Sequence, residues 1–212
     1  MASAPMACLR EVIGQLEAGG ADVVHFDIED GTFVPMMTLG TRLIGQLRPL
    51  STLPFDVHLM MQNPEWLIPE VVALGANWVS VHWEACPYPH RTLRLIHELG
   101  ARAGLAFNPG TPLPDLRYLG GVLDFVLVLT TEPEYPDAAF LPEVLDKMRQ
   151  GRAMLGDGVD WEVDGGIHTG NIGSVVRAGA SVVVSGRSTF QNGLVEENLR
   201  ALRRAILIAT SV

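Results

Sequence analysis

The sequence has little cysteine and little positive charge for its 212 residues. Its two cysteines, Cys8 and Cys86, offer no paired disulfide framework and no Cys-x-x-Cys redox or zinc motif, which suits a reducing cytoplasm. Fifteen Lys and Arg against 24 Asp and Glu give a formal charge of −9. This charge opposes binding to DNA, RNA or an anionic membrane surface. We therefore expect a small-molecule ligand rather than a nucleic acid or a membrane.

Long apolar runs are also missing from the sequence. No uninterrupted stretch approaches the roughly 18 residues that a membrane-spanning helix needs, and residues 1–10 lack the basic start and apolar stretch of a secretion signal. The sequence therefore predicts a cytoplasmic protein. The residues that are present, 48% hydrophobic and 18% charged, are typical of a globular chain, and we expect a single domain over residues 1–212.

Short β-branched, apolar runs alternate along the chain with longer segments of helical periodicity. The seven predicted strands are residues 23–27, 55–60, 78–83, 103–107, 125–130, 161–164 and 181–185. The predicted helices that follow them are residues 41–47, 64–74, 90–99, 141–148, 172–178 and 194–208. Buried strands that alternate with helices indicate a parallel sheet, either in a closed (β/α)8 barrel or in an open doubly wound fold.

Three features favour a TIM (β/α)8 barrel. The number of strand–helix units is close to eight, polar residues recur at the carboxyl ends of the strands, and the sequence has no Gly-x-Gly-x-x-Gly fingerprint. The first strand is the exception, because residues 1–4 are too few for a normal strand before the helix that Pro5 would open. We expect a first strand that is short, truncated or missing.

Two histidines and two aspartates lie at the carboxyl ends of predicted strands. His25 and Asp27 are two residues apart on one strand, so both side chains point to the same face. His58 and Asp164 end two other strands. Together the four would form a site for one divalent metal ion, Zn²⁺, Fe²⁺, Mn²⁺ or Co²⁺, because mixed imidazole and carboxylate ligation suits these ions. Taken singly, each residue has a structural alternative, as a buried His bonded to a carbonyl or an Asp that caps a helix.

The pair Asp27 and Asp164 indicates a reaction. Two carboxylates on opposite faces of a bound carbonyl compound fit the removal of a proton from one face of a carbon and its return to the other, which is an epimerisation. A divalent cation would neutralise the ene-diolate oxygens that form. Gly165-Gly166 and Gly186-Arg187 follow the last two strands, where barrels often present N–H groups to a phosphate, although a tight turn explains paired glycines equally well.

Four runs of sequence resemble the ribulose-phosphate 3-epimerase family: HFDIEDGTFVP at 25–35, DVHLM at 56–60, NPGTP at 108–112 and VDGG at 163–166. The similarity extends from about Leu16 to Phe190. It implies a TIM barrel that converts D-ribulose 5-phosphate to D-xylulose 5-phosphate and forms a homo-oligomer. It also implies that His25, Asp27, His58 and Asp164 hold one divalent metal ion, with Asp27 and Asp164 as the acid–base pair. Met60 would pack beside the reacting carbons, and Gly165, Gly166 and Gly186 would lie near the substrate phosphate.

The sequence departs from the family on the substrate side. The family has a glycine-rich loop after the strand at 125–130, whereas residues 133–138 contain no glycine and include Glu134 and Asp137. These charges would repel a phosphate unless they point away. Arg187 stands where the family usually has a small residue, and would either restore a cationic contact or be an exposed surface residue. The substrate could therefore be a different sugar phosphate, such as a hexulose 6-phosphate, or the chain could be a non-catalytic homologue that binds a ligand or a partner.

Overall fold

A computed structural model describes residues 1–133 and 138–211. Its seven strands form one parallel sheet in which each strand pairs with the next one along the chain. They are β1 (Val24–Glu29), β2 (Phe55–Met60), β3 (Trp78–His82), β4 (Arg102–Phe107), β5 (Phe125–Leu129), β6 (Asp160–Asp164) and β7 (Val182–Val183). All seven lie within two residues of their predicted bounds at either end. The largest differences are at the carboxyl ends of β1, which ends two residues later than predicted, and β7, which ends two residues earlier.

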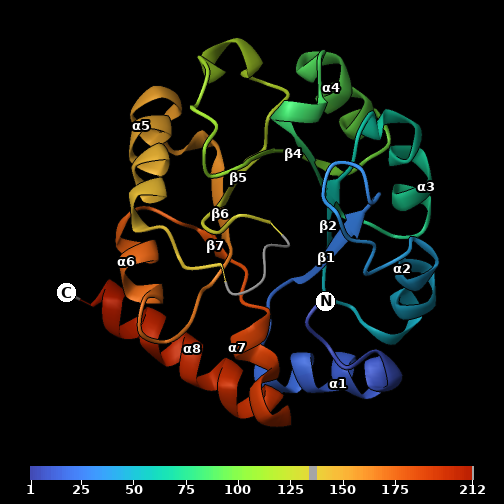
Figure 1. The fold of residues 1–212 in the computed structure, drawn as a ribbon, viewed down its shortest axis with the longest axis vertical. Helices are drawn as coiled ribbons and strands as arrows, with labels where there is room; N and C mark the ends of the chain where they lie inside the picture. Colours follow the sequence, from blue (N-terminus) through green and yellow to red (C-terminus); the bar gives the residue numbers. More distant parts are fainter. Residues whose placement is uncertain (134–137, 212) are drawn as a thin grey trace.

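Helices surround the sheet (Figure 1). The α-helices are α1 (Leu9–Gly19), α2 (Arg42–Leu47), α3 (Ile68–Ala73), α4 (Pro89–Glu98), α5 (Asp146–Leu155), α6 (Ile172–Arg177), α7 (Arg187–Phe190) and α8 (Val195–Thr210). Short 3-10 turns join them: η1 (Met6–Cys8), η2 (Arg48–Leu50), η3 (Pro64–Trp66), η4 (Trp83–Ala85), η5 (Leu116–Leu119), η6 (Pro142–Leu145), η7 (Gly156–Gly158) and η8 (Gln191–Gly193). Because parallel strands covered by helices are shielded on both faces, β2 and β5 are buried along their whole length.

The helix predicted at 141–148 differs from the structure. The segment opens as the 3-10 turn η6, and α5 then continues to Leu155, past Gly151. Glycine lowers helix propensity, so local sequence gave no reason to extend the helix. Tertiary packing supplies that reason, because a Cβ on Gly151 would lie 1.9 Å from Cη2 of Trp161, a fully buried residue of β6. Gly151 is thus the residue that lets α5 lie against the sheet.

The sheet is open on one side. Among the described residues, β1 pairs only with β2 and β7 pairs only with β6. Residues 1–4 form no strand, but Met1 and Ala4 are buried, and the main-chain nitrogen of Met1 donates a hydrogen bond to the carbonyl of His25. The structure therefore confirms a barrel-type fold, and among the described residues no strand precedes β1.

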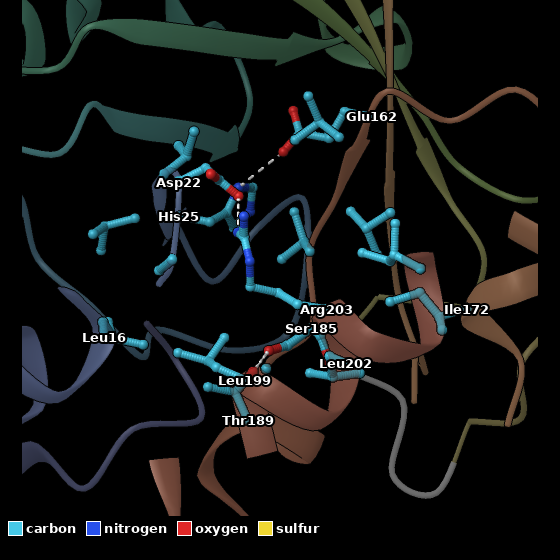
Figure 2. Close-up of a pocket in the computed structure, with 18 of the residues that line it drawn as sticks. Leu16, Asp22, His25, Glu162, Ile172, Ser185, Thr189, Leu199, Leu202 and Arg203 are labelled. Carbon is cyan, nitrogen blue, oxygen red and sulfur yellow. Dashed lines mark hydrogen bonds and ion pairs between the residues drawn. The ribbon is translucent and has the colours of Figure 1, made fainter. Parts of the chain in front are cut away.

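A cavity of about 680 Å³ follows this open side between β1 and β7 (Figure 2). Its walls are largely apolar and include Leu199 and Leu202 of α8, while Arg203 and Asp22 form an ion pair of 2.6 Å on its rim. The cavity is the space left between the two edge strands, so it is a consequence of the open sheet.

None of the helices in the described ranges is long and apolar enough to cross a membrane.

Candidate active site

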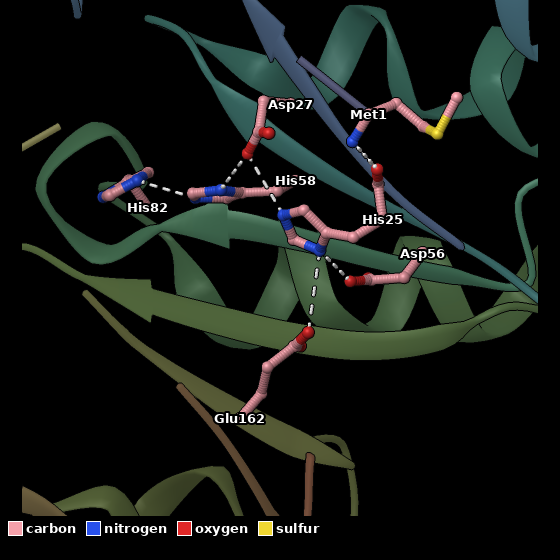
Figure 3. Close-up of polar contacts among 7 residues, drawn as sticks. All are labelled: Met1, His25, Asp27, Asp56, His58, His82 and Glu162. Carbon is pink, nitrogen blue, oxygen red and sulfur yellow. Dashed lines mark hydrogen bonds and ion pairs between the residues drawn. The ribbon is translucent and has the colours of Figure 1, made fainter. Parts of the chain in front are cut away.

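The predicted metal ligands come together from three strands. His25 and Asp27 lie on β1, His58 lies on β2 and Asp164 ends β6. One ligand atom from each of the four residues lies within 4.8 Å of every other. Asp27 and His58 are paired in the β1–β2 register, and Oδ1 of Asp27 is 3.1 Å from Nε2 of His25 and 3.3 Å from Nδ1 of His58 (Figure 3). The structure thus assembles the four residues that the strand-end pattern selected.

The donor set fits a divalent ion. Two imidazoles and two carboxylates are ligands that zinc, iron, manganese and cobalt all accept. Ligand atoms about 2.1 Å from a tetrahedral ion lie about 3.4 Å from one another, which is close to the two separations measured around Oδ1 of Asp27. His25, Asp27, His58 and Asp164 could therefore hold a metal ion.

The pKa values of the two aspartates are pushed in opposite directions. Burial opposes the ionised form of Asp27, but the charge of His25 and hydrogen bonds from His25 and His58 outweigh it and place the pKa well below its usual range. At Asp164, burial and the neighbouring charge of Asp27 raise the pKa. Two carboxyl groups whose pKa values are separated by their surroundings have the character of an acid–base pair.

A second layer of buried acidic groups lies below this cluster. Nδ1 of His25 hydrogen-bonds to Oδ2 of Asp56 and is 3.6 Å from Oε1 of Glu162 (Figure 3). Burial, followed by the charge of Asp56, raises the pKa of Glu162 to about 8. The pKa of His25 is raised well above its usual value, because Asp27 and Asp56 outweigh the effect of burial. Asp56 therefore fixes the orientation of the His25 ring, which leaves Nε2 directed at Asp27.

His82 and Glu84 are parts of the site that sequence reasoning missed. The strand-end pattern did not lead us to His82, yet its Nε2 lies 2.9 Å from Nε2 of His58 and the two rings stack with centroids 4.9 Å apart. Nδ1 of His82 lies 3.1 Å from Oε2 of Glu84. The signal was present, because His82 and Glu84 have the same two-residue spacing at a strand end as His25 and Asp27.

The predicted substrate-binding residues lie around the same mouth. Met60 ends β2, is buried, and is paired in register with Glu29 of β1. Glu29 is also buried, and its Oε2 accepts a hydrogen bond from the main-chain nitrogen of Thr38. Gly165 and Gly166 form the turn after β6, with φ of 114° and 66°. A Cβ on Gly165 would lie 2.5 Å from Oγ1 of Thr131, so this turn requires glycine.

The turn after β6 contacts the segment that follows β7. Ser185 and Ser188 both donate hydrogen bonds to the carbonyl of Ile167. Gly186 lies between the two serines, and a Cβ on it would be 2.8 Å from Oγ of Ser3. Arg187 begins α7 and is exposed. The altered loop includes Glu134 and Asp137, which lie outside the described residues, so the structure does not test their expected effect on a phosphate.

Comparison with known proteins identifies the family. A family model described as the ribulose-phosphate 3 epimerase family matches residues 1–190. The ribulose-phosphate 3-epimerase of Aquifex aeolicus is 41% identical over 208 residues, which cover 97% of this chain and 94% of the relative. The protein of the same name from Escherichia coli K12 is 41% identical over 192 residues, which cover 89% of this chain and 85% of the relative. The chain belongs to the ribulose-phosphate 3-epimerase family.

Solved structures share the fold at low sequence identity. KGPDC from Streptococcus mutans has a TM-score of 0.73 at 15% identity, with 95% of this chain and 93% of that chain covered. The 3-hexulose-6-phosphate synthase of Salmonella typhimurium has a TM-score of 0.68 at 15% identity, with 95% and 94% covered. These likenesses support the barrel-type fold, and membership of the family confirms the expectation of an epimerase, an enzyme of the isomerase class.

Proposed function

We propose that the protein is a metal-dependent ketose-phosphate 3-epimerase that converts D-ribulose 5-phosphate to D-xylulose 5-phosphate. The observation that carries this proposal is the group formed by His25, Asp27, His58 and Asp164, whose ligand atoms all lie within 4.8 Å of one another. It is found in a chain 41% identical to proteins named ribulose-phosphate 3-epimerase. Two carboxylates and two imidazoles at one mouth suit proton transfer beside a polarised carbonyl group.

The metal site consists of His25, Asp27, His58 and Asp164, and the ion is zinc, iron, manganese or cobalt. When bound, the ion supplies positive charge that stabilises the oxygens of an ene-diolate. Asp56 assists by holding the His25 ring through Nδ1, so that Nε2 faces the centre. His58 lies against Asp27 through Nδ1, so the two histidines present different ring nitrogens to the same point.

Proton transfer at C3 is the task of the two aspartates. The carboxylate of Asp27 takes the proton from one face of C3, and the carboxylic acid of Asp164 delivers a proton to the opposite face. Asp27 then carries the proton taken from C3, and Asp164 is ionised because its own proton is now bound to C3. The reverse reaction exchanges the two roles. The opposite pKa shifts of Asp27 and Asp164 favour this assignment, because one group is held towards the ionised form and the other towards the protonated form.

Substrate binding is assigned to residues around the same mouth. Met60 continues the inward-facing row of β2 above His58, which suits packing beside the reacting carbons. Gly165, Gly166 and Gly186 let the main chain approach the phosphate, and Arg187 adds positive charge near it. The ligand is thus a small sugar phosphate.

Three broader assignments accompany this function. The protein is a single domain over residues 1–212, acts in the cytoplasm and forms a homo-oligomer. The exposed side chains of Leu207 and Ile208 on α8 favour association with another subunit, because large apolar groups gain from leaving water. Sedimentation equilibrium of the purified protein measures the oligomeric state directly.

The test is proton exchange at C3 in D₂O. Metal-loaded protein is incubated with D-ribulose 5-phosphate, and NMR follows deuterium at C3 and formation of D-xylulose 5-phosphate. We expect Asp164→Asn and Asp27→Asn to lower the rate by at least about 100-fold, because each removes one partner of the proton transfer. Asp157→Asn, a change of the same kind in the exposed turn η7, is the matched control and should exchange at the wild-type rate.

The alternative functions correspond to distinct results. Exchange with a hexulose 6-phosphate but not with the pentulose phosphate would keep the chemistry and replace the substrate. No exchange with any ketose phosphate, in protein shown to hold metal, would overturn the enzymatic proposal and indicate a homologue that only binds a ligand or partner.

A further inference from the structure

A chain of hydrogen bonds leads away from the candidate metal site through groups that the proposed reaction does not use. It runs from Nε2 of His58 to Nε2 of His82 (2.9 Å), and from Nδ1 of His82 to Oε2 of Glu84 (3.1 Å). Oε1 of Glu84 accepts hydrogen bonds from the main-chain nitrogen of Asn108 (2.9 Å) and from Oγ1 of Thr111. These hydrogen bonds therefore join His58, a candidate metal ligand on β2, to the NPGT segment after β4, a motif that has no role in the proposed reaction.

The direction of these hydrogen bonds is set at the Glu84 end. A main-chain N–H can only donate, so Oε1 of Glu84 is an acceptor. Burial would raise the pKa of Glu84, but hydrogen bonds from His82, Thr111 and Asn108 outweigh it and lower the pKa to about 2, so the carboxylate is ionised. An ionised carboxylate only accepts, and Nδ1 of His82 must therefore carry a proton.

The same reasoning passes from His82 to His58. His82 is fully buried, and a neutral imidazole ring carries a single proton. With that proton on Nδ1, Nε2 of His82 is an acceptor, and Nε2 of His58 must be the donor. The remaining nitrogen of His58, Nδ1, is the atom that faces Oδ1 of Asp27 at 3.3 Å.

We propose that His82 and Glu84 are positioning residues that hold the proton of His58 on Nε2 and so present the lone pair of Nδ1 to a metal ion at the candidate site. The proposal rests on the proposed function for the presence of the ion. The positions of the protons on the two histidine rings can, however, be tested in metal-free protein. Partners of this kind fix the tautomer and ring orientation of a ligating histidine. Asn108 and Thr111 extend the arrangement, because they hold Glu84 against His82.

The same arrangement explains why a cation belongs between His58 and Asp27. A neutral His58 with its proton on Nε2 has no proton to donate across the 3.3 Å between its Nδ1 and Oδ1 of Asp27, so the hydrogen bond at this contact needs a second proton on His58. Without one, two acceptors face each other and repel. A metal ion bound to both atoms, or a second proton on His58, removes the repulsion. The proton positions that Glu84 of η4 sets on the two histidine rings thus favour a cation between His58 and Asp27 of β1.

The first test is a readout of ring protons by NMR. Nitrogen-15 spectra of histidine rings in metal-free and Zn²⁺-loaded protein distinguish a proton on Nδ1 from a proton on Nε2. We expect His82 to carry its proton on Nδ1, the less common tautomer of free histidine, and His58 in the Zn²⁺ form to carry its proton on Nε2. A proton on Nε2 of His82 would overturn the proposal, whatever the metal site does.

The second test is Co²⁺ affinity, measured by calorimetry and by the visible absorption of the bound ion. His82→Phe keeps a ring of similar size beside Phe33 and His58 but removes both hydrogen bonds, so we expect affinity to fall by about 10- to 100-fold. His82→Gln should restore part of the loss, because its amide oxygen can accept from Nε2 of His58. Glu84→Gln carries the same test if His82→Phe does not fold.

A matched control comes from another histidine–carboxylate pair. His97 of α4 lies 2.6 Å from Asp124 and outside the site, so His97→Phe should leave Co²⁺ affinity within about twofold of wild type. Folded His82→Phe or Glu84→Gln protein with wild-type affinity would overturn the positioning role. A wild-type protein that binds no Co²⁺ would instead overturn the metal site of the proposed function, and the two failures are therefore distinguishable.

Discussion

Gly165 shows how strictly a single position near the active site is constrained. Its φ of 114° lies in a region that side chains rarely adopt, and a Cβ would lie 2.8 Å from the main-chain nitrogen of Thr131. The sequence alone left Gly165-Gly166 open to two interpretations, a tight turn or a phosphate contact. The structure shows that backbone geometry alone already requires glycine at this position, so the pair is explained before any ligand is considered.

We expect Gly165→Ala to lower the free energy of unfolding by about 1–3 kcal/mol, because the new side chain is strained in both conformation and space. Urea unfolding followed by circular dichroism measures the change. Gly158→Ala is the control, since Gly158 is exposed and no atom lies within 4 Å of its added Cβ. Equal stability of the two variants would contradict the strain at Gly165.

The residues of the candidate site also show what local pattern can predict. His25 and Asp27 were found because a two-residue spacing on a strand places both side chains on one face. His82 and Glu84 have the same spacing, but His58, the candidate ligand to which His82 is hydrogen-bonded, lies on a neighbouring strand. Spacing can select such residues, whereas only the assembled sheet shows which pair is linked to a ligand.

At the scale of elements, Glu84 ties η4 to the segment that follows β4. It accepts hydrogen bonds from Asn108 and Thr111, while Lys147 of α5 donates to the carbonyls of Asn108 and Pro109. Three elements are therefore held together through one short loop. The NPGTP motif at 108–112, which the sequence analysis used only as a family signature, has a structural task here.

This junction predicts a pH dependence of stability. The pKa of Glu84 is lowered from 4.5 to about 2, so its ionised form stabilises the fold above pH 4.5, and this contribution is lost as pH falls towards 2. The loss amounts to up to about 3 kcal/mol. The difference in unfolding free energy between wild type and Glu84→Gln should therefore shrink as pH falls from 6 to 3.

Urea unfolding at several pH values measures that difference. Glu98→Gln, which removes an exposed ion pair with Arg94 on α4, is the control and should cost less than about 1 kcal/mol at pH 6. A difference between wild type and Glu84→Gln that stays constant down to pH 3 would show that Glu84 does not titrate as its hydrogen bonds require.

At the scale of the whole molecule, the site joins strands that are distant in the chain and lie near the open side of the sheet. His25 and Asp27 are on the edge strand β1, and Asp164 is on β6, next to the other edge strand β7. Among the described residues no strand joins these edges, so a bound ion would link both sides of the opening. We infer that metal binding stabilises the whole fold.

We expect calorimetry to show one cooperative unfolding transition, as for a single domain, which metal moves upwards. At a free metal concentration 100 times the dissociation constant, binding adds about 2.7 kcal/mol. For a chain of this length, that corresponds to a rise of about 5–10 °C in Tm. A chelator should reverse the shift, and His25→Ala should show no shift. Two separate transitions, or an unchanged Tm in protein shown to bind metal, would contradict this picture.

The sequence by itself determined the alternation of strands and helices, the lack of a normal strand in residues 1–4 and the four candidate ligands. These features are local, because strand periodicity and strand-end position can be read without knowing what packs where. Tertiary structure decided the extent of α5, the buried layer of Asp56 and Glu162 beneath His25, and the link from Glu84 through His82 to His58. Each of these depends on contacts between segments far apart in the chain. Local sequence patterns do not contain such contacts, which form only when the sheet is assembled.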